Sequence, residues 1–190
     1  MTIASPLAAL AAAAVTAALL SSPAPAVAQV KLVDEVKIGA LAHDLGFLGH
    51  HVETGADINL EVLFASPEAL RIIGSPRPHI GGDINTDGHT SDGYFGLTWG
   101  IGLPSLFGWG QGLFINGSLG GSINNGRINS GPPTEKLLGS SILFRESAEL
   151  GYQFTPIVNA SALLSHISNA NLGKHNQGIT SAGGRLGFRF

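Results

Sequence analysis

The feature that most constrains this sequence is a two-residue alternation of apolar and polar side chains, which recurs along the chain after residue 28. Such a period places the two kinds of side chain on opposite faces of a β-strand. In residues 57–64 the apolar positions are Ile58, Leu60, Val62 and Phe64. Eight segments of this kind can be marked, at 34–44, 56–65, 78–84, 92–103, 112–123, 140–154, 158–168 and 179–190. The pattern predicts an all-β fold, with one short helix near 67–73.

The length of these segments narrows the fold further. Several have ten or more residues, whereas strands of soluble proteins usually have about five or six. A soluble lipocalin-like barrel turns its apolar face inward, and an outer-membrane barrel turns it outward. The polar stripes carry Arg145 and Glu149 in one segment, and Arg185 and Arg189 in another. Their spacing places these charged side chains where ion pairs can form inside a narrow lumen. We expect an eight-stranded antiparallel transmembrane β-barrel, and a soluble exported lipocalin-like carrier is the alternative.

The first 28 residues have a different character, because none of them is charged. An apolar run at 7–20 is followed by prolines and by the small-x-small tripeptide 26–28, which is typical of a cleaved signal peptide. A membrane helix is the competing interpretation, but a run of 14 residues is short for one. We therefore expect a signal peptide at 1–28 and one outer-membrane β-barrel domain at 29–190, in the bacterial cell outer membrane.

Composition excludes several classes of function. The net charge of −3 argues against a nucleic-acid binder, which would carry a basic surface. The absence of cysteine excludes disulfide scaffolds, thiol catalysis and cysteine–zinc sites. His50 and His51 with Glu53 could bind a metal, but we expect them in an exposed loop. No metal and no cofactor are expected.

Two polar residues interrupt the apolar face of the segment 158–168. If both termini are periplasmic, this seventh strand ends in the outer leaflet, where His166 and Ser168 follow four apolar residues on the lipid-facing stripe. Facing lipid is costly for a polar group. Residues two apart on a strand share a face, so an imidazole can act as a base on a serine nucleophile in ester hydrolysis. The plainer interpretation is that both side chains contact lipid head groups.

The residues after this strand carry a resemblance to a known family. His166-Ile-Ser168-Asn169-Ala170, then Asn176-Gln-Gly178, then a closing strand that ends in Phe190, is similar to the lipid A 3-O-deacylase (PagL) family, an acyloxyacyl hydrolase-like outer-membrane family. Its members are eight-stranded barrels that remove the 3-linked acyl chain from lipid A. The resemblance implies that Ser168 is the nucleophile and His166 its general base. It implies that Asn169 and Asn176 orient the loop or support the oxyanion.

One position departs from the family. The family places a glutamate on the last strand, twelve residues after the nucleophile, and this chain has Thr180 there. A hydroxyl cannot stabilise an imidazolium as a carboxylate does. The resemblance therefore leaves open a catalytically silent structural or interaction barrel of the same fold.

Glu146 is the candidate for the missing acid. It is the one charged residue on the outward stripe of the sixth strand. If Phe154 pairs with Val158 across the short turn, Glu146 lies opposite His166, at a Cβ separation of about 5 Å. We expect Glu146 to orient His166, and the alternative is that it contacts head groups.

These observations together predict an outer-membrane esterase that hydrolyses an ester-linked acyl chain of lipid A. The expected partner is lipid A or lipopolysaccharide of the outer leaflet, and nucleic acid is not expected. The sequence leaves open whether two copies of the chain form a homodimer.

Overall fold

The computed structural model describes residues 31–107 and 110–190. Within them the strands are β1 (Val33–Ala42), β2 (Ala56–Phe64), β3 (Arg77–Asn85), β4 (Asp92–Gly102), β5 (Leu113–Asn124), β6 (Ile142–Gln153), β7 (Val158–Ser168) and β8 (Ile179–Arg189). A 3-10 helix, η1 (Glu68–Ile73), follows β2, and a short helix, α2 (Leu103–Phe107), follows β4. All eight predicted strands are confirmed, and so is the short helix expected near 67–73. The proposed signal peptide lies outside the described residues.

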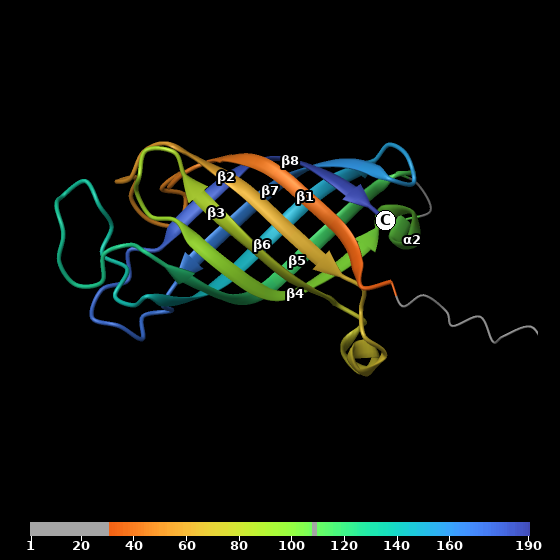
Figure 1. Cartoon of the computed structure of the whole chain (residues 1–190), viewed down its shortest axis with the longest axis horizontal. Helices are drawn as coiled ribbons and strands as arrows, with labels where there is room; N and C mark the ends of the chain where they lie inside the picture. Colours follow the sequence, from red (N-terminus) through yellow and green to blue (C-terminus); the bar gives the residue numbers. More distant parts are fainter. Residues whose placement is uncertain (1–30, 108–109) are drawn as a thin grey trace, which may run out of the picture. The chain divides into compact units, whose positions relative to one another are not determined.

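The strands form one closed antiparallel barrel in which each strand pairs with its neighbour in sequence (Figure 1). The barrel closes where β8 pairs with β1, for example Ile38 with Leu186. Closure leaves no strand edge with unpaired backbone groups. Among the described residues, no helix has the length and apolarity needed to cross a membrane.

The barrel interior is polar and charged. Glu149 of β6 forms ion pairs with Lys37 at 2.7 Å and with Arg185 at 2.6 Å, and all three side chains are buried. The predicted pairing of Arg145 with Glu149 is wrong. Arg145 instead lies over the ring of Tyr94, with 3.6 Å between its Cζ and the ring centroid. A charged interior excludes the lipocalin-like arrangement, in which apolar side chains would fill the barrel.

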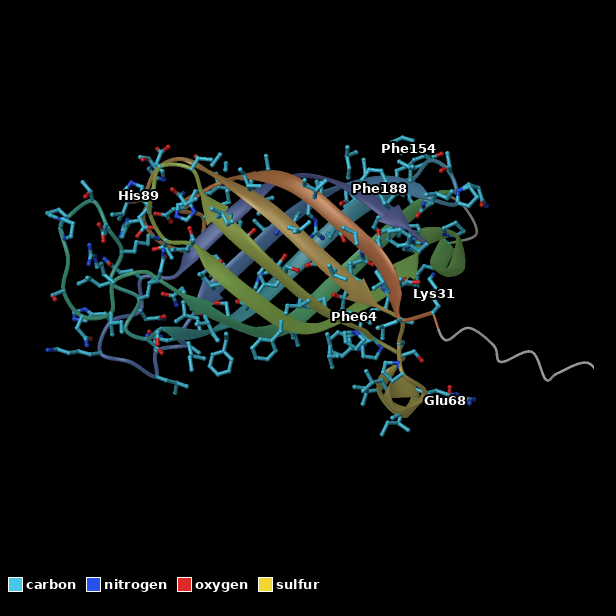
Figure 2. All side chains as sticks on the ribbon, viewed as in Figure 1. Lys31, Phe64, Glu68, His89, Phe154 and Phe188 are labelled. Carbon is cyan, nitrogen blue, oxygen red and sulfur yellow. The ribbon has the colours of Figure 1, made fainter. Side chains whose placement is uncertain are left out.

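The outer wall is apolar, as a lipid-facing surface requires. Its exposed side chains include Ile58, Leu60, Ile80, Phe95, Leu119, Ile142, Leu150 and Leu186. Figure 2 shows Phe154 and Phe188 near the C terminus, and His89 at the opposite end of the barrel.

The two ends of the barrel differ in their connections. The loops 43–55, 86–91, 125–141 and 169–178 gather at one end, which we call the long-loop end. The opposite end carries the four-residue turn 154–157 and the connections that contain η1 and α2. Outer-membrane barrels have short periplasmic turns and longer extracellular loops.

Candidate functional site

The last residues of β7 at the long-loop end carry the predicted pair. His166 and Ser168 lie on the outer face of the barrel, each half-buried. The predicted register is confirmed: Phe154 N donates to Val158 O, and Glu146 of β6 pairs with His166. On the other side, Thr180 of β8 pairs with His166. One row across three strands therefore contains Glu146, the imidazole and Thr180.

The imidazole of His166 is held from the β8 side. Its Nδ1 is hydrogen-bonded to Oγ1 of Thr180 at 2.8 Å, and Thr180 is only 2% exposed. The backbone of Thr180 is fixed in turn, because its carbonyl accepts a hydrogen bond of 2.7 Å from Leu45 N in the loop 43–55. With Nδ1 occupied in this way, Nε2 is the nitrogen left for a second partner.

Gly178 packs against the other side of the ring. A Cβ atom at Gly178 would lie 2.9 Å from Nε2 and 2.7 Å from Cε1 of His166, and 2.8 Å from Ile167 O. The imidazole occupies the space that a side chain would need. Continuing the β7–β8 pairing puts Gly178 at the level of Ser168, so Nε2 faces the row that contains the serine. Within the described chain, Ser168 Oγ forms no hydrogen bond.

Glu146 has the predicted position without a direct contact. Its side chain faces outward and is exposed, and it is close enough to His166 for an electrostatic interaction. In the described residues its carboxylate forms no hydrogen bond or ion pair. The role of Glu146 in orienting the imidazole stays a prediction, and Thr180 is the group that contacts Nδ1.

The two asparagines brace the loop after β7. Asn169 is buried, and its Nδ2 donates to Leu138 O at 2.8 Å. Its backbone N–H donates to Oδ1 of Asn176 at 2.9 Å, and Asn176 Nδ2 donates to Asn171 Oδ1 at 3.0 Å. Because the Asn169 N–H is already engaged, this geometry suits support of the loop better than donation to an oxyanion.

A groove of about 460 Å³ runs along the outer wall beside the imidazole. Its floor is made by Gly117 and Ala148, which pair across β5 and β6. Leu119 and Leu164 line it, and Trp99, which pairs with Gly117, closes one side. The lining also includes Leu48, Glu146, His166 and Thr180. An apolar groove with small floor residues can hold a hydrocarbon chain next to the histidine.

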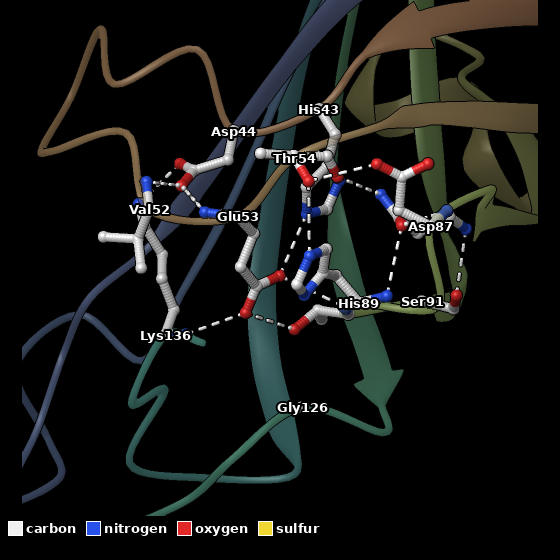
Figure 3. A network of polar contacts seen from close by, with 12 residues as sticks. His43, Asp44, Val52, Glu53, Thr54, Asp87, His89, Ser91, Gly126 and Lys136 are labelled. Atoms are coloured by element: carbon white, nitrogen blue, oxygen red, sulfur yellow. Dashed lines mark hydrogen bonds and ion pairs between the residues drawn. The ribbon is translucent and has the colours of Figure 1, made fainter. Parts of the chain in front are cut away.

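The loops above this groove contain a buried ionic network that the sequence did not predict (Figure 3). Glu53 was expected in an exposed loop, but it is 1% exposed. His43 lies between two carboxylates, with Nε2 3.0 Å from Glu53 Oε2 and Nδ1 2.8 Å from Asp57 Oδ1. Lys136 N donates to Glu53 Oε1 at 2.8 Å, and Thr90 N donates to Oε2 at 3.1 Å.

Both central groups of this network are charged at neutral pH. Burial alone would lower the pKa of His43, but its hydrogen bonds to Asp57 and Glu53 outweigh that effect and raise the pKa to about 9. Burial alone would raise the pKa of Glu53, but hydrogen bonds from His43, Lys136 and Thr90 lower it to about 2. His43 and Glu53 belong to the loop 43–55, Asp57 lies in β2, and Thr90 and Lys136 come from two other loops, so no single motif or spacing in the sequence joins them.

Comparison with known proteins places this site in context. Residues 73–189 match the model of the family described as lipid A 3-O-deacylase (PagL). A crystal structure of the outer membrane enzyme PagL shares 17% identity over 82% of this chain and 99% of that chain, with a TM-score of 0.59. The N-terminal β-barrel domain of Pseudomonas aeruginosa OprF shares 18% identity over 83% and 98%, with a TM-score of 0.51. At such identity the structures show the fold. No match was found among curated proteins.

Proposed function

We propose a reaction for this chain from one premise: the chain belongs to the lipid A 3-O-deacylase (PagL) family and is a bacterial outer-membrane β-barrel. The proposed reaction is hydrolysis of an ester-linked acyl chain of lipid A. Ser168 is the nucleophile and His166 the general base, at the lipid-facing wall of the barrel. A chain embedded in the outer leaflet meets lipid A laterally, so the substrate reaches β7 without entering the lumen.

The observation that carries this proposal is the fixed imidazole beside an unengaged serine. Thr180 Oγ1 contacts Nδ1 of His166 at 2.8 Å. If Nδ1 carries the proton and donates it to Thr180, Nε2 is left as an acceptor. Gly178 leaves room for Nε2 at the level of Ser168. The half-buried serine is two residues along the same face, which is the arrangement that a serine–histidine pair needs.

The proposed steps conserve atoms and charge. Ser168 Oγ attacks the ester carbonyl carbon while Nε2 of His166 takes the hydroxyl proton. The tetrahedral intermediate collapses, and the bond to the sugar oxygen breaks as the imidazolium returns its proton to that oxygen. A water molecule then attacks the acyl-serine, again with His166 as base, and releases the fatty acid. The apolar groove holds the acyl chain through these steps.

Glu146 is proposed as the acid that stabilises the imidazolium. Its register opposite His166 and its electrostatic interaction with the ring support this role. A carboxylate facing lipid without a purpose would be expensive. The second candidate function is a catalytically silent barrel of the same fold, which is favoured by Thr180 at the position of the family's glutamate.

The test is the mass of lipid A incubated with the purified barrel. The wild-type protein should remove one acyl chain, and Ser168→Ala should lower the rate by about 10³-fold or more. Different gel migration of unheated and boiled samples will show that the variant is still folded. Undiminished hydrolysis by Ser168→Ala would remove the serine from the nucleophile role. Intact lipid A with the wild-type protein would favour the silent barrel.

Two further features are proposed from the sequence. The first is cleavage of residues 1–28, which amino-terminal sequencing of the membrane form should show as a chain that starts at Gln29. The second is a homodimer, which crosslinking of the protein in native membranes tests directly.

A further inference from the structure

A second, polar pocket lies at the long-loop end next to the groove. Its volume is about 120 Å³, and its lining includes Leu48, His50, Lys136, Asn176, Gln177 and Gly178. Leu48 also lines the apolar groove, and Gly178 packs on the imidazole of His166. The polar pocket and the apolar groove therefore adjoin at Leu48, and Gly178 of the polar pocket packs on the histidine that lines the groove.

Lys136 is buried beside this pocket and is held there by two contacts. Its side chain is 2% exposed, and its Nζ lies 2.6 Å from Asp44 Oδ1. Nζ also donates to Gly178 O at 2.6 Å. Asp44 is held in place because its Oδ2 accepts hydrogen bonds from Val52 N and Glu53 N (Figure 3). An ammonium group has three N–H donors, so one remains after these two contacts.

The side-chain oxygens of the two amides that line the pocket already accept hydrogen bonds from the backbone. Gln177 Oε1 accepts from Leu137 N at 2.6 Å, and Asn176 Oδ1 accepts from Asn169 N. In the described part of the chain, the side-chain NH2 of Gln177 has no partner, and neither has the imidazole of His50. No carboxylate is among the lining residues. The pocket offers mainly N–H donors, so it fits a group that only accepts hydrogen bonds, and a phosphate ester is such a group.

We propose that this pocket binds a phosphate of the head group of the lipid whose acyl chain occupies the groove. The inference rests on the proposed function, because the groove contains His166 and the polar pocket lies beside it across Gly178, as an amphiphile with a central ester requires. Lys136, Gln177 and His50 supply the hydrogen-bond donors to the phosphate. Lys136 also donates to the carbonyl of Gly178, which packs on the imidazole.

The test uses Gln177→Glu, which keeps an oxygen for Leu137 N and replaces the free NH2 by a negatively charged oxygen. Lys174→Gln is the matched control, because it makes the same charge change at an exposed residue of the same loop that does not line the pocket. Each is made in the Ser168→Ala background, so that binding is measured without hydrolysis. The probes are an acylated sugar phosphate and the same acylated sugar without its phosphate, in detergent micelles.

The expected result is that Gln177→Glu weakens binding of the phosphorylated probe about tenfold, with little change for the dephosphorylated probe. Lys174→Gln should change neither. Equal weakening of both probes would overturn the inference and show that Gln177 only supports Leu137. Equal affinity of the parent protein for the two probes would also overturn it.

Two additional measurements separate a lipid head group from free phosphate, and binding from hydrolysis. Inorganic phosphate at millimolar concentration should compete only weakly with the phosphorylated probe, because it lacks the acyl chain that the groove holds. Strong competition would assign the pocket to free phosphate and overturn the head-group assignment. A phosphate-dependent preference in binding supports the inference even if wild-type protein hydrolyses neither probe, a result that would count against the proposed reaction alone.

Discussion

Nδ1 of His166 and Oγ1 of Thr180 lie 2.8 Å apart across the β7–β8 pair, on the outer face of the barrel. The position at which the sequence resemblance implies a glutamate is thus occupied by a residue that contacts the imidazole but carries no charge. Thr180 can set the tautomer and the orientation of the ring. It cannot neutralise the imidazolium that forms when the ring accepts a proton.

Thr180→Val tests the orienting contact. Valine has nearly the shape of threonine but removes the hydrogen bond, so kcat for acyl release should fall about tenfold, as expected for the loss of about 1.4 kcal/mol. Steady-state hydrolysis of lipid A in micelles gives kcat and KM separately. Since the groove is unchanged, KM should stay close to the wild-type value. A variant with full kcat would show that the hydrogen bond has no part in the reaction.

Glu146→Gln tests the proposed acid. The change removes the charge that faces the imidazole while leaving the size of an exposed side chain almost unchanged. Because a carboxylate stabilises the imidazolium only after proton transfer, we expect a fall in kcat at constant KM. Thr180→Glu should restore part of the lost rate by supplying a carboxylate from β8. Unaltered kcat in Glu146→Gln would assign Glu146 to the head-group region.

Gly178→Ala tests the space beside Nε2. The new methyl group would approach Nε2 and Ile167 O at 2.9 and 2.8 Å, so the ring has to move. We expect kcat to fall by a factor of about 10² or more, because displacement of a catalytic group by about 1 Å is costly. Gly184→Ala is the control, since a Cβ at Gly184 meets nothing within 4 Å. Equal activity of the two variants would contradict the position assigned to the imidazole.

The strand plan was predictable because lipid on one side and a polar lumen on the other impose a strict period of two. The register of β6 and β7 was predictable for a local reason, since Phe154 pairs with Val158 across a short turn. From that one pair, the position of Glu146 opposite His166 follows.

The loop network was not predictable in the same way. Lys136 contacts Asp44, Glu53 and Gly178, which lie 42 to 92 positions away in the sequence. Such contacts depend on how separate loops pack over the barrel, and no local period or spacing records that. The partner of Arg145 was wrongly predicted for a related reason. Residues four apart on one strand share a face, but in a closed barrel the nearest charge comes from across the lumen.

Gly117→Leu tests the groove. A Cβ atom at Gly117 meets nothing within 4 Å, and the position opens into the groove, so leucine should be accommodated by the barrel while filling the floor between Trp99 and Ala148. Release of long acyl chains should become slower, with KM raised about tenfold, whereas a short-chain ester should be hydrolysed at the wild-type rate. Gly184→Leu, on the outer face of β8, is the matched control. Equal losses for long and short chains would show that the groove does not hold the acyl group.

The last prediction concerns pH and the loops. The pKa of Glu53 falls from an ordinary 4.5 to about 2, so its ionised form stabilises the folded loops fully above pH 4.5, and the stabilisation is lost as the pH falls towards 2. The pKa of His43 rises from 6.5 to about 9, so its stabilisation is complete below pH 6.5 and is lost as the pH rises through 9. The network should therefore be most stable between pH 4.5 and 6.5.

Amide hydrogen exchange in the loops 43–55 and 125–141, corrected for the intrinsic pH dependence of exchange, should show the greatest protection in that window. In His43→Gln the protection of these loops should no longer fall as the pH rises through 9, because glutamine does not titrate. The protection of β5 and β6 should stay constant. If the loops of His43→Gln still lose protection at alkaline pH, a group other than the imidazolium between Asp57 and Glu53 stabilises them.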